Sequence, residues 1–115
     1  MSPALSLKPG DEQIVRTILK RHLPRGTRVF VFGSRAGLSS KPPKPMSDLD
    51  LSLEAASPLT LATLARLAED FDESPLPWKV DLVDRASVSE AFGRIIDATK
   101  QPFDIDWPSG DSKQA

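Results

Sequence analysis

The sequence contains no cysteine, no tyrosine and a single histidine, His22. The lack of cysteine excludes disulfide scaffolds, cysteine zinc sites and thiol catalysis. A histidine-based triad or a multi-histidine metal site would have to be built from one residue, which argues against these classes of site. Any chemistry is therefore expected to come from carboxylates and hydroxyls.

Long apolar runs and an excess of one charge are also missing. The longest uncharged apolar run, residues 29–33, is far shorter than the roughly 20 residues that cross a bilayer, and the opening residues lack the pattern of a secretory signal. Fifteen basic and sixteen acidic residues give a formal net charge of −1, which argues against holding nucleic acid by phosphate neutralisation. We therefore expect a soluble, cytoplasmic protein that binds neither membranes nor nucleic acid directly.

The length of 115 residues and the mass of 12.5 kDa correspond to one domain, without room for a separate substrate domain. Residues 1–9 and 108–115 are small and polar, with prolines or a glycine, and are expected to be flexible tails. The folded domain is expected to extend over residues 10–107.

Apolar periodicity predicts three helices and three strands in the order α-β-β-α-β-α. Helices are expected over residues 11–23, between Pro58 and Pro75, and from a capping box at residues 87–90 onward. Strands are expected over residues 28–32, 48–53 and 78–83. The short link between the first two strands favours antiparallel pairing, so the expected fold class is α/β (α+β), with a small mixed β-sheet flanked by helices.

The second expected strand alternates polar residues with Leu49, Leu51 and Leu53, which are expected to face the core. Asp48 and Asp50 then share the opposite face, about 7 Å apart, where they repel each other by about 2 kcal/mol at an effective dielectric of about 20. A divalent cation would remove this penalty, and oxygen ligands favour Mg²⁺ or Mn²⁺ over Zn²⁺. Taken alone, the alternation is also typical of a half-exposed sheet surface.

The first expected strand ends at Gly33 and Ser34. Glycine allows a sharp turn that exposes backbone amides toward an anion, and the serine adds a hydroxyl donor, as in a phosphate-binding turn. Arg35 follows, with a guanidinium group that suits a polyphosphate. Asp81, in the third expected strand, would share a metal with the other two aspartates and accept a proton from an attacking hydroxyl. Gly33 and Ser34 alone would also fit an ordinary strand-ending turn.

Together and in this order, these motifs resemble the nucleotidyltransferases of the DNA polymerase β superfamily, and most closely the minimal nucleotidyltransferase (MNT) proteins. The matching segments are Val29 to Ala36 (VFVFGSRA), Ser47 to Leu51 (SDLDL) and Val80 to Asp84 (VDLVD). The likeness extends from residue 28 to residue 84 and into the following helix, and the ordered combination is what makes it specific. It implies a polymerase β-type nucleotidyltransferase fold.

The resemblance also implies roles for two groups of residues. The residues that it implies for nucleotide binding are Gly33, Ser34, Arg35 and Ser47. The residues that it implies as catalytic residues and as ligands of two Mg²⁺ ions, with Mn²⁺ as the alternative, are Asp48, Asp50 and Asp81. Asp81 is implied to activate the acceptor hydroxyl as well.

One spacing departs from the family pattern. Thirteen residues separate Ser34 from Asp48, which is more than the family usually has. The excess lies in residues 39–46, which hold three prolines and two lysines and are expected to be a mobile excursion. Because lengthening a loop costs little free energy, the longer spacing does not by itself break the site.

MNT proteins are commonly encoded with a helical HEPN partner, so the resemblance implies the antitoxin of a HEPN/MNT toxin-antitoxin pair. Such an antitoxin transfers AMP from ATP to a tyrosine of the HEPN ribonuclease toxin. Two alternatives stay open. One is a catalytically vestigial MNT-fold antitoxin or binding module that neutralises its partner by contact. The other is a small-molecule, antibiotic-type nucleotidyltransferase that needs a separate acceptor-binding subunit. The sequence fixes neither the acceptor nor the preferred nucleotide, and it leaves open whether the protein forms an oligomer.

Further residues have expected roles other than nucleotide binding, metal binding and catalysis. His22 is expected to interact with the dipole at the end of the first helix. Trp78 and Trp107 would either stack on a base or pack at an edge, and packing is the expectation. Asp84 is expected at the end of the third strand, and Asp84 and Arg85 are expected either to support the site residues from behind or to lie on the surface.

Overall fold

The computed structural model describes residues 7–37 and 47–107. Its elements are α1 (Pro9–His22), β1 (Arg28–Phe32), the short 3₁₀ helix η1 (Gly33–Ala36), β2 (Leu49–Glu54), α2 (Leu61–Glu73), β3 (Val80–Asp84), the 3₁₀ helix η2 (Arg85–Ser87), α3 (Glu90–Thr99) and β4 (Gln101–Phe103). The expected tails, apart from residues 7–9, and the expected mobile excursion lie outside the described residues. In the described part of the chain, no helix is long and apolar enough to cross a membrane.

Helix α1 begins two residues before the expected start, at Pro9. Proline suits the first helical position, because its φ angle is already helical and its missing N–H has no partner there in any helix. Leu7, just before the helix, packs against the core. Residues 7–9, which were expected to belong to the flexible tail, are therefore part of the fold.

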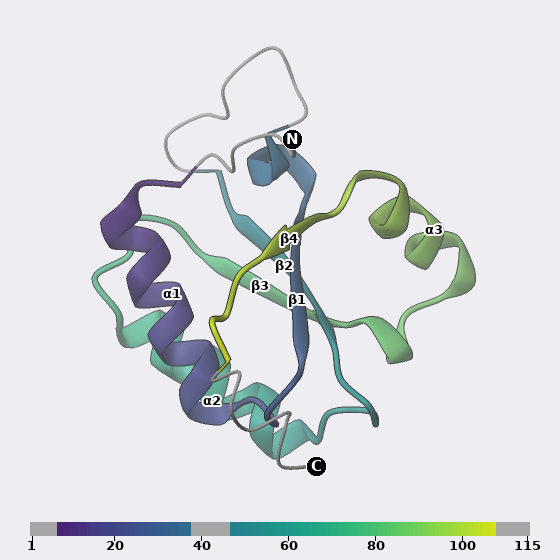
Figure 1. Cartoon of the computed structure of the whole chain (residues 1–115), viewed down its shortest axis with the longest axis horizontal. Helices are drawn as coiled ribbons and strands as arrows, with labels where there is room; N and C mark the ends of the chain where they lie inside the picture. The colour runs from purple at the N-terminus through teal and green to yellow at the C-terminus, as the bar shows by residue number, and fades with distance from the viewer. Residues whose placement is uncertain (1–6, 38–46, 108–115) are drawn as a thin grey trace.

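The strands form one mixed sheet in the order β3-β2-β1-β4. Figure 1 shows α1 and α2 on one side of this sheet and α3 on the other. β1 pairs antiparallel with both β2 and β4, whereas β2 pairs parallel with β3. The small mixed sheet and the antiparallel pairing of the first two strands are thus confirmed. The edge strand β4 was missed, because three residues that include Pro102 are too short for a period-two pattern, and proline is tolerated only at such edges.

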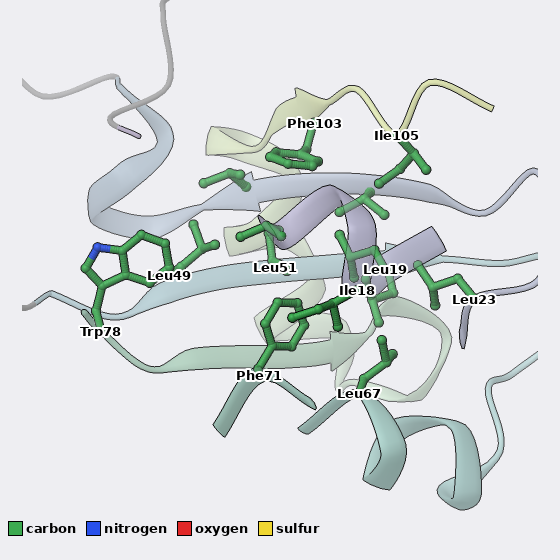
Figure 2. Packing of buried hydrophobic residues seen from close by; sticks show 14 of the residues in the cluster. Ile18, Leu19, Leu23, Leu49, Leu51, Leu67, Phe71, Trp78, Phe103 and Ile105 are labelled. Atoms are coloured by element: carbon green, nitrogen blue, oxygen red, sulfur yellow. The ribbon is translucent and has the colours of Figure 1, made fainter. Parts of the chain in front are cut away.

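One face of the sheet packs against α1 and α2 to form the hydrophobic core (Figure 2). Leu49, Leu51 and Leu53 are fully buried on this face, as their alternation predicted. Leu19 of α1 and Leu67 of α2 are also fully buried in this cluster. The alternating side chains of β2, which include Asp50, therefore belong to the opposite face.

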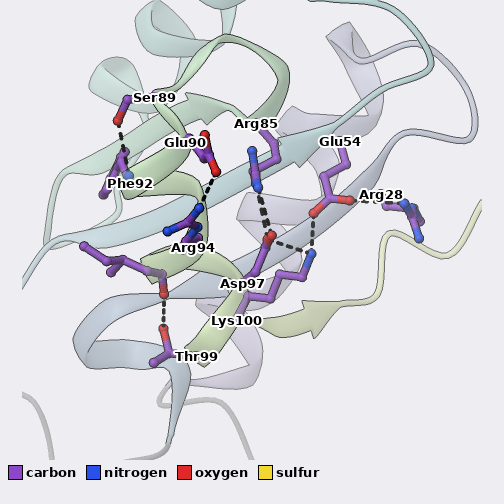
Figure 3. A network of polar contacts seen from close by, with 11 residues as sticks. Arg28, Glu54, Arg85, Ser89, Glu90, Phe92, Arg94, Asp97, Thr99 and Lys100 are labelled. Atoms are coloured by element: carbon purple, nitrogen blue, oxygen red, sulfur yellow. Dashed lines mark hydrogen bonds and ion pairs between the residues drawn. The ribbon is translucent and has the colours of Figure 1, made fainter.

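The opposite face carries α3, which ionic contacts tie to the ends of the strands (Figure 3). Asp97 of α3 accepts hydrogen bonds from Arg85, at 2.8 Å, and lies 3.2 Å from the ammonium nitrogen of Lys100. Lys100 also pairs with Glu54 at the end of β2, at 2.7 Å. The guanidinium group of Arg85 lies so close to Gly93 that a Cβ atom there would stand 2.6 Å from it. The guanidinium group of Arg85 thus packs directly against the backbone of α3 at Gly93.

The start of α3 differs from the expected capping box. The N-cap is Ser89, whose hydroxyl accepts a hydrogen bond from the backbone N–H of Phe92 at 3.2 Å. Ser87 is occupied elsewhere, because its hydroxyl donates to the buried carboxylate of Asp84 at 2.9 Å. The same carboxylate accepts from the backbone N–H groups of Leu59 and Ala86. Asp84 ends β3, as expected, and its burial contradicts only the alternative of a surface group.

Replacing Leu51 is expected to destabilise the whole fold. Because Leu51 is fully buried on the central strand β2, Leu51→Ala leaves a cavity and is expected to lower the free energy of unfolding by about 2–5 kcal/mol. Urea denaturation followed by circular dichroism measures this change. The matched control is Leu61→Ala in α2, because Leu61 is 85% exposed and its loss should change the stability by less than about 0.5 kcal/mol. Equal effects of the two variants would contradict the assigned core.

The ion pairs of Asp97 with Arg85 and Lys100 are expected to weaken in acid. Hydrogen bonds from Arg85, and then from Lys100, lower the pKa of Asp97 to about 2. Because this pKa is lower in the folded than in the unfolded state, the carboxylate stabilises the fold above about pH 4, and this stabilisation is lost as the pH falls toward 2. Asp97→Asn should therefore be less stable than the wild type at pH 7, and the difference should shrink below about pH 4. Denaturation midpoints at several pH values test this, with Glu69→Gln in α2 as control; a constant difference would contradict the assignment.

Candidate functional site

The candidate site is a row of residues that crosses three neighbouring strands. The parallel register pairs Asp50 of β2 with Asp81 of β3, and the antiparallel register pairs Asp50 with Phe32, the last residue of β1. Gly33 follows directly. The carboxyl end of β1 thus meets the amino ends of β2 and β3, and this meeting brings the predicted glycine turn and the predicted aspartates together.

The position of Gly33 requires glycine for two reasons. Its φ angle is +75°, in the left-handed region that side chains other than glycine rarely adopt. In addition, a Cβ atom at this residue would stand 2.5 Å from the Oδ2 atom of Asp50. The turn after β1 and the carboxylate on β2 therefore share one small space, and a larger residue would displace one of them.

The three aspartates interact through their charges and through a hydrogen bond. The pKa of Asp50 is raised to about 6, first by burial and then by the negative charges of Asp81 and Asp48. A hydrogen bond between the side chains of Asp50 and Asp81 raises it further. Asp48 and Asp81 are exposed, whereas Asp50 is partly buried between its neighbours. The structure thus concentrates negative charge at one position on the sheet.

The donor chemistry of this cluster fits a hard divalent cation. Among the residues that the structure describes, no group of three or more carboxylate, histidine or cysteine side chains is arranged as a ready metal cage. Asp50 and Asp81 are instead direct neighbours in the parallel register, and their negative charges interact. Mg²⁺ typically binds one or two carboxylates and completes its shell with water and phosphate oxygens, so this pair offers the ligands that it takes.

The remaining predicted nucleotide residues differ in their exposure. Ser34 is exposed next to Gly33, in the short helix η1. Ser47 is partly buried just before β2, and its carbonyl oxygen accepts a hydrogen bond from the Nε atom of Arg35 at 2.9 Å. In the sequence, Ser34 directly follows Gly33 and Ser47 directly precedes Asp48. Both serines are therefore neighbours of predicted site residues.

Arg35 lies in an environment that the sequence did not indicate. It is only 6% exposed, and its guanidinium carbon lies 4.7 Å from the centre of the Trp78 ring. Burial lowers the pKa of Arg35, although the negative charge of Asp11 opposes this shift. Through its bond to Ser47, the guanidinium group ties η1 to the start of β2. These contacts hold Arg35 between η1, the start of β2 and Trp78, and its predicted contact with a nucleotide phosphate stays a prediction.

Both tryptophans pack against the protein, as expected. Trp78 is 8% exposed and belongs to the hydrophobic core next to Arg35. The Nε1 atom of Trp107 donates to the carbonyl oxygen of Thr27 at 2.9 Å, and the ring packs against the core. The stacking of Arg35 on Trp78 was missed, because the two residues are far apart in the sequence and no local pattern links them.

A mixed sheet that gathers a Gly-Ser turn and three aspartates in this way defines a protein of the nucleotidyltransferase class. The chain is 45% identical, over 92 residues, to the probable protein adenylyltransferase MntA of Haemophilus influenzae (strain ATCC 51907 / DSM 11121 / KW20 / Rd). This match covers 80% of this chain and 77% of that protein. The chain therefore belongs to the MntA family of minimal nucleotidyltransferases, which confirms the resemblance seen in the motifs. No family model matches the sequence.

Solved structures of toxin-antitoxin complexes share the fold. One is a crystal structure of a toxin-antitoxin with AMP-PNP, with a TM-score of 0.63 and 24% identity over 90% of this chain and 79% of that chain. Another contains a tri-AMPylated HEPN toxin of Shewanella oneidensis in complex with an MNT antitoxin, with a TM-score of 0.58 and 21% identity over 90% of this chain and 77% of that chain. These likenesses confirm the predicted nucleotidyltransferase fold.

The titration of Asp50 tests the geometry of the site in the metal-free protein. Its carboxyl group is expected to titrate near pH 6, as measured by carbon NMR of the aspartate side chains. Asp81→Asn should lower the pKa of Asp50, because it removes a neighbouring negative charge. Asp48→Asn should lower this pKa less, because Asp48 contributes less to the shift. An Asp50 carboxyl group that titrates near pH 4 in the wild type would show that the aspartates do not converge.

Proposed function

We propose that this protein is a cytoplasmic protein adenylyltransferase that transfers AMP from ATP to a hydroxyl group of a HEPN-type toxin and thereby acts as its antitoxin. The observation that carries this proposal is the row of Gly33, Asp50 and Asp81 across three strands. The relative named as a probable protein adenylyltransferase supports the reaction class. The similar complexes with AMP-PNP and with an AMPylated HEPN toxin support the nucleotide and the partner.

The glycine turn is assigned to the phosphates of ATP. Gly33 has no side chain, so its backbone can approach an anion closely, and the exposed hydroxyl of Ser34 can donate to a phosphate oxygen. Ser47 is assigned to the same nucleotide site from the start of β2. Arg35 acts on this group indirectly, because its hydrogen bond to Ser47 fixes η1 relative to β2.

The aspartates are assigned to the transfer itself. Mg²⁺ or Mn²⁺ held by Asp48, Asp50 and Asp81 would neutralise the phosphates and the charge that develops on the departing pyrophosphate. Asp81 is exposed on the edge strand β3 and accepts the proton of the acceptor hydroxyl. The acceptor oxygen forms a bond to the α-phosphorus while the bond from this phosphorus to the bridging oxygen of the β-phosphate breaks. Pyrophosphate carries away the bonding electron pair.

Transfer of a labelled phosphate tests the proposal. The full-length protein is incubated with the purified HEPN-type partner, Mg²⁺ and ATP labelled at either the α- or the γ-phosphate. The α-label alone is expected on the partner, and Asp81→Asn should slow its appearance by about 10²-fold or more, because a general base is lost. Glu69→Gln, an exposed carboxylate of α2, should label the partner at the wild-type rate.

Other outcomes of the same experiment favour other functions. Transfer of the γ-label would overturn nucleotidyl transfer in favour of a kinase. If no label appears and the Asp48→Asn, Asp50→Asn double variant still neutralises the toxin, the protein is an antitoxin that acts by contact alone, and the proposed enzyme is overturned. Label on a small-molecule acceptor, with the HEPN-type partner left unlabelled, would favour the antibiotic-type nucleotidyltransferase.

A further inference from the structure

A hollow of about 500 Å³ opens beside the candidate site, at the end of the sheet where β2 and β3 begin. It is lined by Asp48, by Phe71 and Asp72 in the last turn of α2, and by residues 76–79, which lead into β3. The nucleotide and metal assignments above use only Asp48 among these residues. This hollow, called the β3 hollow below, is therefore next to the reacting groups and has no assigned ligand.

The link between α2 and β3 forms a fixed wall of the β3 hollow. Pro75 and Pro77 lie in this link, and their rings restrict its backbone. The hydroxyl of Ser74 donates to the carbonyl oxygen of Phe71 at 2.7 Å and accepts from the backbone N–H of Leu76 at 3.4 Å. Leu76 also packs against the hydrophobic core. The wall is therefore formed before any ligand binds.

The lining of the β3 hollow combines apolar and charged groups. Phe71 and Trp78 form an apolar floor, because they are 5% and 8% exposed and belong to the core cluster (Figure 2). Asp48 and Lys79 are exposed and bring charged groups to the same hollow. Such a lining suits a side chain with an apolar body and a polar tip, as the phenol group of tyrosine has. The shorter hydroxyl side chains of serine and threonine would leave the floor uncovered.

The β3 hollow lies on the side from which an acceptor must approach. The attacking oxygen and the leaving pyrophosphate stand on opposite sides of the phosphorus atom in an in-line displacement. The sheet order places β2, with Asp50, between β3 and β1, and the turn assigned to the phosphates follows β1 at Gly33. Lys79 directly precedes β3, and its carbonyl oxygen accepts from the backbone N–H of Leu49 at 2.9 Å. The hollow and the glycine turn are thus on opposite sides of Asp50.

A partner has free access to the β3 hollow within the part of the chain that the structure describes. There, no strand pairs with the outer edge of β3. Pro77 and Lys79, next to this edge, are both exposed. A surface segment of another protein can therefore place one side chain in the hollow without displacing an element of this fold.

We infer that the β3 hollow is the acceptor subsite, which takes the aromatic, hydroxyl-bearing side chain of the partner protein and directs its oxygen toward Asp48 and Asp81. The ring lies against Leu76 and Pro77, over the apolar floor. The oxygen then forms a bond to the α-phosphorus, its proton passes to Asp81, and pyrophosphate leaves with the electrons of the broken bond. This inference rests on the proposed function, because it requires the α-phosphate to lie at the three aspartates.

Filling the β3 hollow tests the inference in the full-length protein. Pro77→Trp adds a bulky side chain at an exposed position of the wall, so the fold should be retained. AMP transfer to the purified HEPN-type partner is measured over a range of partner concentrations, and AMP-PNP binding with Mg²⁺ is measured by calorimetry. Pro77→Trp should lower kcat/KM for the partner by about 10- to 200-fold, the range by which a mismatch of size in an apolar pocket discriminates. AMP-PNP should bind as tightly as in the wild type.

Two control variants separate filling of the hollow from other effects. Pro77→Ala removes the proline ring but leaves the hollow open, so it should label the partner at a rate close to that of the wild type. Leu61→Trp adds the same bulk at an exposed position of α2, about 15 Å along the helix from Phe71, and should change neither measurement. Equal losses in Pro77→Ala and Pro77→Trp would assign Pro77 to packing and overturn the subsite. Loss of AMP-PNP binding in Pro77→Trp would place the hollow in the nucleotide site, with the same consequence.

The labelled residue of the partner tests the class of side chain. Mass spectrometry of the labelled partner is expected to find AMP on a tyrosine, because an aromatic ring covers the apolar floor of the hollow. AMP on a serine or threonine would overturn the aromatic acceptor.

The outcomes also separate this inference from the proposed function. If the wild type labels the partner and Pro77→Trp labels it equally fast, the acceptor subsite is overturned, and the proposed reaction keeps its support. If Pro77→Trp changes only the molar mass of the protein in solution, measured by light scattering, the hollow is an interface between copies of this chain instead. If the wild type transfers no α-label, the proposed nucleotidyl transfer fails and the subsite fails with it.

Discussion

The structure depends on the close approach of the Asp50 carboxylate to two neighbours that give it no compensating positive charge. On one side it occupies the space in which a side chain at residue 33 would stand, and on the other it meets the carboxyl group of Asp81. Such an arrangement costs free energy in the isolated protein, as the raised pKa of Asp50 records. A fold does not need this cost for its own stability, so the arrangement points to a ligand that carries positive charge.

The mixed sheet is the means by which this approach is achieved. Asp50 and Asp81 can be direct neighbours on one face only because β2 and β3 run parallel in register. Parallel strands need a crossover connection, and α2 supplies it while covering the core face. The antiparallel pairing of β1 with β2 then places Gly33 beside the amino end of β2. The same topology therefore explains the position of the core helices and the convergence of the polar residues.

Much of the fold and most of the site geometry could be predicted from the sequence, because they depend on local patterns. The alternation of Leu49, Leu51 and Leu53 fixed which face of β2 is buried, and the ordered motifs indicated that a glycine turn and three aspartates meet. Three features depend instead on partners far along the chain. β4 forms by pairing with β1, Ser87 is held by Asp84 and so cannot cap α3, and Arg35 is buried against Trp78. No local pattern contains this information.

The two ends of the row differ in how open they are, and this difference bears on the acceptor. An in-line displacement at phosphorus needs the attacking and the leaving oxygen on opposite sides of the phosphorus atom. At one end, the glycine turn after β1 flanks the side assigned to the leaving pyrophosphate. At the other end, Asp81 is exposed on β3, and within the described residues no strand pairs with the outer edge of β3. This open side, next to the proposed general base Asp81, is accessible to a hydroxyl group on the surface of another protein. Under the proposed function, this protein orients the nucleotide and the proton acceptor, and the partner brings the hydroxyl group to the open end of the row.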